Sequence, residues 1–116
     1  MTWSIEAHDS TLFDELYSEA SVLSHREAIG SDLAQLRERG LELLNTNRLK
    51  NLGGGLFEMR IRRRPDLLLR VFLTMVHPSR LILLSCYNKQ RDPSELRQRR
   101  EIKKARNLIE EIQGRK

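Results

Sequence analysis

The residues with the clearest chemical potential in this sequence are three cations in or beside strand-like segments. Arg60 lies on the polar side of a segment in which apolar and polar residues alternate, Arg70 interrupts an otherwise apolar segment, and Lys89 follows another apolar segment. Several cations on one sheet can bind a phosphodiester and stabilise the negative charge that builds up on it in a transition state. We therefore take Arg60, Arg70 and Lys89 as candidate catalytic residues.

Cleavage of RNA suits these residue types because the substrate carries its own nucleophile, the ribose 2′-OH. Such an enzyme needs positive charge, positioning, a general base and a general acid, but neither a metal nor a nucleophile from the protein. Arginine, with a pKa above about 12, is a poor base. Lysine can act as a base where neighbouring cations lower its pKa, so Lys89 is a candidate for that role.

Arg70 is the most informative of the three cations because of its apolar neighbours in the sequence. A buried arginine without a partner costs several kcal/mol, by order of magnitude. Arg70 is therefore expected to pair with an acid such as Glu58 or to open onto a concave surface. The structural alternative, a strand arginine that extends to solvent or only holds an ion pair, stays open.

No pattern in the sequence predicts a metal or a nucleotide cofactor. His8, His25 and His77 are isolated from one another and from clusters of Cys, Asp or Glu. The glycine triplet 53–55 lacks the Lys-Ser/Thr pair that completes a phosphate-binding P-loop, so a turn is the expected use of these glycines. We expect neither a metal nor a cofactor.

Charge is divided unequally between the two halves of the chain. Residues 1–47 contain 3 basic and 9 acidic residues, a net charge of −6, whereas residues 48–116 contain 18 basic and 7 acidic residues, a net charge of +11. A strongly basic half indicates a polyanionic partner, of which nucleic acid is the first candidate.

Composition also predicts where the protein works. No apolar run approaches the roughly 20 residues that span a bilayer, and residues 1–9 do not resemble a secretory signal. The single cysteine, Cys86, cannot form an internal disulfide and lies in an apolar run, which is typical of a small buried residue in a reducing compartment. We expect a cytoplasmic protein without membrane contact.

The elements that must position these side chains can be inferred from hydrophobic periodicity. We predict one α+β domain over residues 1–116, in the order βααβββα, with two N-terminal helices and a C-terminal helix packed on an antiparallel-rich sheet. The predicted elements are a strand at 3–7, a helix at 12–20, a helix from a capping box at 24–27 to Gly40, a loop at 45–55, strands at 56–62, 67–76 and 81–87 with turns at 63–66 and 77–79, and a last helix capped by Asp92.

Four sequence segments, in this order, resemble one protein family. Residues 52–60, Leu-Gly-Gly-Gly-Leu-Phe-Glu-Met-Arg, resemble a strand of HigB-like toxins, a phage-related branch of the RelE/ParE superfamily. Residues 69–72 resemble that family's next strand, residues 83–90 its apolar strand that ends in an aromatic residue and a lysine, and residues 92–105 its closing helix. The resemblance covers roughly residues 3–113.

This resemblance implies the fold described above and a function. It implies a toxin that cleaves mRNA on the ribosome and is neutralised by a cognate antitoxin, often of the helix-turn-helix type. By position, Arg60 and Arg70 match the family's phosphate-binding arginines, Lys89 matches its strand-end lysine, and Tyr87 is placed to stack on a base. Exposed cations add an RNA-binding surface, which we assign to Arg62, Arg91, Arg99, Arg100, Lys103 and Lys104.

Two departures from the family leave the acid–base assignment open. Residues 90–92 are Gln-Arg-Asp instead of a run rich in Lys and Thr, and the last helix has no tyrosine or histidine where some relatives keep a catalytic group. Two alternatives remain: a ParE-like toxin that binds a topoisomerase without cutting RNA, and a degenerate, non-toxic RNA-binding homologue. A nuclease needs the cluster of Arg60, Arg70 and Lys89, and a topoisomerase binder does not.

Overall fold

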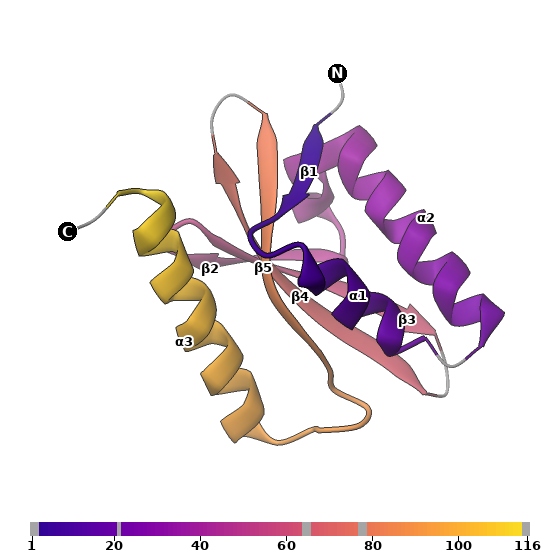
Figure 1. Cartoon of the computed structure of the whole chain (residues 1–116). Coiled ribbons are helices and arrows are strands. Elements are labelled where there is room, and N and C mark those ends of the chain that lie inside the picture. Colours follow the sequence, from indigo (N-terminus) through magenta and orange to yellow (C-terminus); the bar gives the residue numbers. More distant parts are fainter. Residues whose placement is uncertain (1–2, 21, 64–65, 77–78, 115–116) are drawn as a thin grey trace.

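The chain folds into three helices, a short 3-10 helix and one five-stranded sheet (Figure 1). The computed structural model describes residues 3–20, 22–63, 66–76 and 79–114. In chain order the elements are β1 (Ser4–Ala7), α1 (Thr11–Ser18), α2 (Leu23–Arg39), the 3-10 helix η1 (Gly40–Asn45), β2 (Leu49–Gly53), β3 (Leu56–Arg63), β4 (Leu67–Val76), β5 (Arg80–Asn88) and α3 (Glu95–Ile112). The predicted α+β class is confirmed.

The sheet is mixed, with antiparallel pairs predominating. Its strand order is β1-β5-β4-β3-β2, in which β1 pairs with β5 in parallel and the other neighbours are antiparallel. An ion pair joins the two strands of the parallel pair, with Arg80 Nε of β5 2.6 Å from Glu6 Oε2 of β1. The edges of the sheet are therefore β1, from the start of the chain, and β2.

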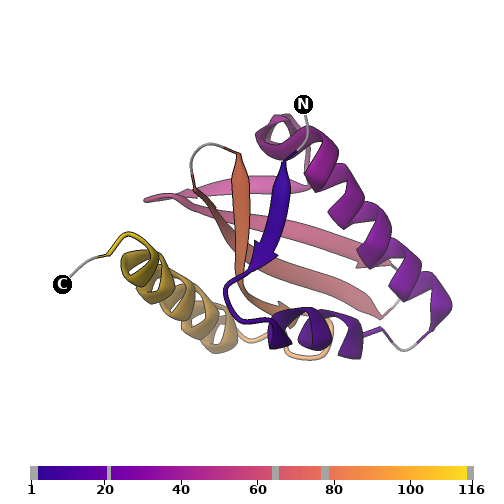
Figure 2. The same cartoon turned by 45° about the horizontal axis from the view of Figure 1, so that its top comes forward.

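Both faces of the central strands are covered. One hydrophobic cluster joins the sheet to α1 and α2 and includes Leu16, Ile29 and Val71, whereas a second cluster joins it to α3 and includes Phe72 and Ala105. Figure 2 shows α2 and α3 on opposite sides of the sheet. Coverage on both faces explains why β4 and β5 read as nearly continuous apolar runs.

The strand β2 was not predicted; the sequence analysis treats residues 45–55 as a loop. The segment is polar and mostly exposed, so it lacks the apolar alternation by which a strand is recognised. It exists as an edge strand because its backbone pairs with β3, with Leu49 opposite Met59. The predicted glycine turn does lie between the two strands, where Gly53, Gly54 and Gly55 have φ of 88°, 65° and 84°, values that residues with a Cβ rarely adopt.

The predicted helix starts need two corrections. The capping box at 24–27 is wrong, because α2 starts at Leu23 and its N-cap, Val22, forms no side-chain cap hydrogen bond. The cap of α3 is Ser94, which accepts from the backbone N–H of Arg97, and Asp92 instead accepts from Ser94. The predicted turns at 63–66 and 77–79 include residues 64–65 and 77–78, His77 among them, which lie outside the described residues.

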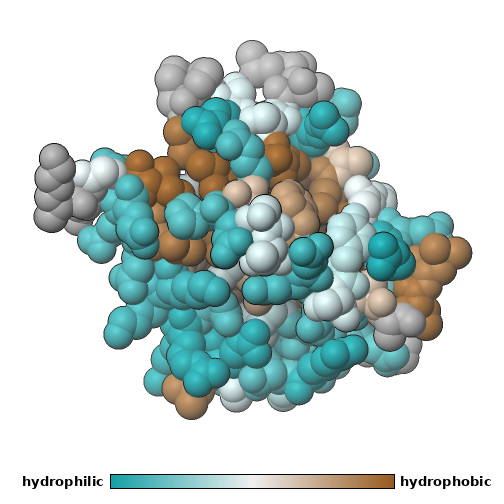
Figure 3. Space-filling view, in the orientation of Figure 1, coloured by the Kyte–Doolittle hydropathy of each residue, from teal (hydrophilic) through white to brown (hydrophobic). Residues whose placement is uncertain are grey.

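The surface is mainly hydrophilic, as the lower half of the space-filling view in Figure 3 shows. Exposed apolar side chains include Val22 and Leu23, where α2 begins, and Leu96 on α3. No helix within the described ranges is long and apolar enough to cross a membrane.

Candidate functional site

Strand register brings three of the predicted site residues into one row across the sheet. Arg60 of β3 lies opposite Arg70 of β4, and Arg70 lies opposite Tyr87 of β5. Side chains that are directly opposite one another project from the same face, here the face on which α3 packs against Tyr87. These residues are far apart in the sequence, and the strand register makes them neighbours.

The carboxylate of Glu58 holds the two arginines together. Arg70 Nη1 lies 3.3 Å from Glu58 Oε1 and 3.2 Å from Oε2, and Arg60 Nε lies 3.4 Å from Oε1. Like charges directly opposite each other on neighbouring strands repel, and the shared carboxylate offsets that repulsion. The predicted pairing of Arg70 with Glu58 is confirmed, and we call these three residues the Glu58 cluster.

The members of the Glu58 cluster differ in their access to solvent. The Glu58 side chain is 2% exposed, that of Arg70 is 11% exposed and that of Arg60 is 34% exposed. A ligand in solution can therefore contact Arg60 directly, while the buried Arg70 contributes positive charge to the site without being accessible itself. The cluster carries one net positive charge, two guanidinium groups against one carboxylate, on an otherwise covered sheet face.

Two buried polar atoms beside the Glu58 cluster have no hydrogen-bond partner among the described residues. They are Arg70 Nε and the Tyr87 hydroxyl oxygen. Burial raises the pKa of the Tyr87 hydroxyl, and the neighbouring charge of Arg70 partly opposes that change. Buried polar groups usually have partners, so these two unpaired atoms are unusual, and a ligand could reach them only after the side chains that cover them move.

Tyr87 is less open than base stacking requires. The residue is 3% exposed, its ring lies parallel to that of Phe72 with the centroids 6.3 Å apart, and the Arg97 guanidinium lies 5.3 Å from its centroid. In this structure the ring is therefore covered, and a base could stack on it only after Arg97 moves away.

Lys89 lies just beyond β5, beside the next row of side chains. Arg62 of β3 lies opposite Leu68 of β4, and the Leu68 carbonyl accepts a hydrogen bond of 2.8 Å from the Lys89 backbone N–H. The buried amide of Asn88 fixes this point: its Oδ1 accepts from the backbone N–H groups of Leu68 and Gln90, and its Nδ2 donates to the Asp66 carbonyl. Lys89 thus has a well-anchored backbone.

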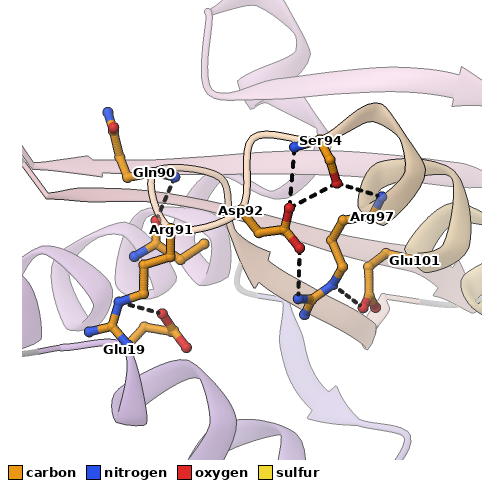
Figure 4. Close-up of polar contacts among 8 residues, drawn as sticks. Glu19, Gln90, Arg91, Asp92, Ser94, Arg97 and Glu101 are labelled. Atoms are coloured by element: carbon orange, nitrogen blue, oxygen red, sulfur yellow. Dashed lines mark hydrogen bonds and ion pairs between the residues drawn. The ribbon is translucent and has the colours of Figure 1, made fainter.

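The rest of the loop between β5 and α3 is held by ion pairs and capping contacts (Figure 4). Arg91 Nε lies 3.5 Å from Glu19 Oε1, next to the end of α1, so this predicted RNA-binding cation already has a partner. Arg97 Nε lies 2.8 Å from Glu101 Oε2, and its Nη1 lies 3.6 Å from Asp92 Oδ2. Hydrogen bonds with Ser94 lower the pKa of Asp92, and Arg97 lowers it further.

The predicted RNA-binding cations of α3 lie on its exposed side. Arg99 pairs with Glu95 at 3.1 Å, both side chains being largely exposed, whereas Arg100, Lys103 and Lys104 are exposed without an ion-pair partner among the described residues. No ion pair or hydrogen bond links them to the Glu58 cluster within the described residues.

Two arginines that the sequence analysis did not select also belong near the site. Arg48 and Arg63 line a pocket together with Arg60, Arg62, Asp32 and Asn47. Arg48 precedes a strand that was not predicted, and Arg63 was assigned to a turn, so only the fold relates them to Arg60. Within the described residues there is no group of three or more His, Cys, Asp or Glu side chains that could hold a metal.

Comparison with known proteins gives one match. A family model described as phage derived protein Gp49-like (DUF891) matches residues 20–110, which is well over half of the chain. The matched range includes the Glu58 cluster, Lys89 and most of α3. Neither the curated proteins nor the solved structures gave a significant match.

Proposed function

Because the chain belongs to the phage-derived Gp49-like family, which is associated with the toxins of toxin–antitoxin systems, we propose that it is a toxin that cleaves mRNA on the ribosome. Within the toxins, the sequence motifs favour the HigB-like branch of the RelE/ParE superfamily. Its partners are a cognate antitoxin of the helix-turn-helix type, the ribosome and mRNA, and it acts in the cytoplasm.

The observation that carries the proposal is the Glu58 cluster. A phosphodiester that approaches Arg60 meets a guanidinium group that is one-third exposed and held by a single 3.4 Å contact. Arginine binds phosphate through two parallel N–H donors, so a phosphate can replace the weak contact with Glu58 by a stronger one. Arg70 stays on Glu58 and supplies a fixed positive charge close to the reacting phosphate.

The proposed chemistry uses the 2′-OH of the RNA. The 2′-oxygen forms a bond to phosphorus and the bond from phosphorus to the 5′-oxygen breaks, which leaves a 2′,3′-cyclic phosphate and a 5′-hydroxyl. A base takes the proton from the 2′-OH and an acid gives a proton to the departing 5′-oxygen. We assign the base to Lys89, and Arg60 stabilises the charge on the non-bridging oxygens.

The test is cleavage of an mRNA by purified protein in the presence of translating ribosomes. Wild type should cleave within the ribosome-bound message, and Arg60→Ala should reduce the saturated rate at least tenfold, about 1.4 kcal/mol of transition-state stabilisation. Arg39→Ala, which removes an exposed arginine from α2, is the matched control and should cleave like wild type.

The same variants should differ in toxicity when they are expressed in cells. Induced expression of wild type and of Arg39→Ala should arrest growth and inhibit translation, whereas Arg60→Ala should be tolerated. Arrest by a folded Arg60→Ala variant at full strength would contradict the nuclease assignment and favour a ParE-like action on a topoisomerase.

A further inference from the structure

A pocket of about 340 Å³ lies at the edge of the sheet, beside the Glu58 cluster. We call it the edge pocket. Its lining residues are Asp32 of α2, Asn47 and Arg48 before β2, and three residues of β3: Arg60, Arg62 and Arg63. Arg60 belongs both to this pocket and to the Glu58 cluster, so the two sites are continuous.

The edge pocket exists because β2 is shorter than β3. The Arg60 N–H donates to the Arg48 carbonyl at 2.9 Å, and beyond this point β3 continues to Arg63 with β4 on one side and no strand on the β2 side. Backbone groups of a strand alternate in direction, so the N–H of Arg62 points to the same open edge. This N–H donates no backbone hydrogen bond to any of the described residues.

The pocket holds more positive charge than its own groups neutralise. It contains four guanidinium groups and one carboxylate, that of Asp32, which lies 3.6 Å from Arg48 Nη1. Arg63 donates to the Arg62 carbonyl at 3.2 Å, and the Arg62 side chain has no partner within the described part of the chain. Burial raises the pKa of Asp32, and Arg48 and Arg63 partly oppose this change.

Charged side chains beside an open stretch of strand, such as the end of β3 that β2 does not cover, also prevent pairing with other chains, and for that purpose they only need to extend into water. Here four arginine side chains line one pocket, and the backbone N–H of Arg62 points to the open edge beside them. Arginine forks and free backbone N–H groups together are donors suited to phosphate oxygens.

We propose that the edge pocket binds a backbone phosphate of the RNA strand, next to the phosphate that Arg60 contacts at the Glu58 cluster. The path of the strand rests on the proposed function. Arg60 and Arg62 are two residues apart on one face of β3, about 6.6 Å at about 3.3 Å per residue. This spacing allows neighbouring phosphates of an extended single strand to contact one arginine each.

Binding of a non-cleavable RNA tests the proposal without requiring catalysis. The probe is a fluorescent hexaribonucleotide with 2′-O-methyl groups, measured by anisotropy at several salt concentrations. The double variant Arg62→Ala/Arg63→Ala should bind about tenfold more weakly and show a smaller salt dependence. The control, Arg37→Ala/Arg39→Ala, removes two charges from α2 and should bind like wild type.

A second probe localises the contact. Replacing single phosphodiesters by neutral methylphosphonates should weaken wild-type binding at one linkage more than at the others, and the double variant should lose that sensitivity. Equal affinity of the double variant and wild type would overturn the proposal, as would equal sensitivity at every linkage.

Two further outcomes distinguish this proposal from binding of free phosphate and from the proposed nuclease function. Inorganic phosphate should displace the probe much more weakly than unlabelled RNA at the same concentration of phosphate groups, and equal displacement by the two would overturn the assignment to a strand. If the protein fails to cleave mRNA on ribosomes but the double variant still loses affinity, the edge pocket stands and the nuclease function falls.

Discussion

Arg70 and Glu58 form a buried ion pair in which one nitrogen of the arginine lies 3.2 and 3.3 Å from the two oxygens of the carboxylate. The pair joins β4 to β3 beneath the more exposed Arg60. Removing one member of a buried pair leaves the other as an uncompensated charge. We expect Arg70→Met to lower the free energy of unfolding by about 3–5 kcal/mol, measured by urea denaturation.

A double-mutant cycle checks the cause of that loss. Glu58→Leu/Arg70→Met removes both charges, so it should be more stable than Arg70→Met alone, although Arg60 then lacks its carboxylate. Stabilities that simply add would show that the ion pair does not account for the cost.

Lys89 and the cations of α3 should affect different steps. Lys103→Ala/Lys104→Ala should weaken ribosome binding in a salt-dependent way but leave the saturated single-turnover rate near normal, because exposed cations act mainly through counterion release. Lys89→Arg should bind normally and react slowly, because arginine keeps the charge but does not transfer a proton. If Lys89→Arg reacts at full rate, Lys89 only binds phosphate and the base must be another group.

Cleavage should persist in EDTA when the ribosomes are kept intact by other means. The 2′-OH mechanism assigns all of the charge stabilisation to guanidinium groups and none to a metal ion. The measurement is single-turnover cleavage with and without chelator, with sucrose-gradient profiles to confirm intact ribosomes. A requirement for a divalent metal at the toxin itself would contradict the mechanism.

Cys86 should be unreactive in the folded protein. Burial raises the pKa of its thiol to about 12, and the nearby carboxylates of Glu15, Glu101 and Glu19 add to this change. The thiolate is the reactive form, so at pH 8 the thiol should stay protonated and react slowly with a disulfide reagent. Labelling should become fast in denaturant, and fast labelling of the folded protein would contradict the buried position.

Much of the fold follows from periodicity because the pattern and the packing agree. The boundaries of β4 match the predicted 67–76, since a strand covered on both faces is apolar along most of its length. The predicted start of α2 failed for the opposite reason. Ser24 and Glu27 have the spacing of a capping box, which would start the helix at His25, but the helix begins two residues earlier, at Leu23, so that the serine lies inside the first turn.

The candidate site was only partly predictable, because the sequence of one strand does not show which of its residues lie opposite which residues of the neighbouring strand. Arg70 had to have a partner, and Glu58 is the nearest acid on the preceding strand-like segment. The alignment of Arg60, Arg70 and Tyr87 depends on pairing, including a register shift between Phe72 and Leu73 that no pattern indicates. The edge pocket depends on the length of β2, which pattern analysis did not detect.

The ribosome must make β5 before β1 can pair with it, so the sheet is completed only after this strand has been synthesised. Glu6 of β1 is 74 positions from its partner Arg80, and synthesis at about 5–20 residues per second puts about 4–15 s between them. Contacts between residues so far apart in the sequence form slowly, because closing the long intervening loop costs entropy before the contacts can stabilise the fold. If the chain is the nuclease proposed here, a nascent copy cannot cut RNA until the ribosome has passed the codons for Arg70 and Lys89, so the part of the message that encodes them is read before that copy can act on it.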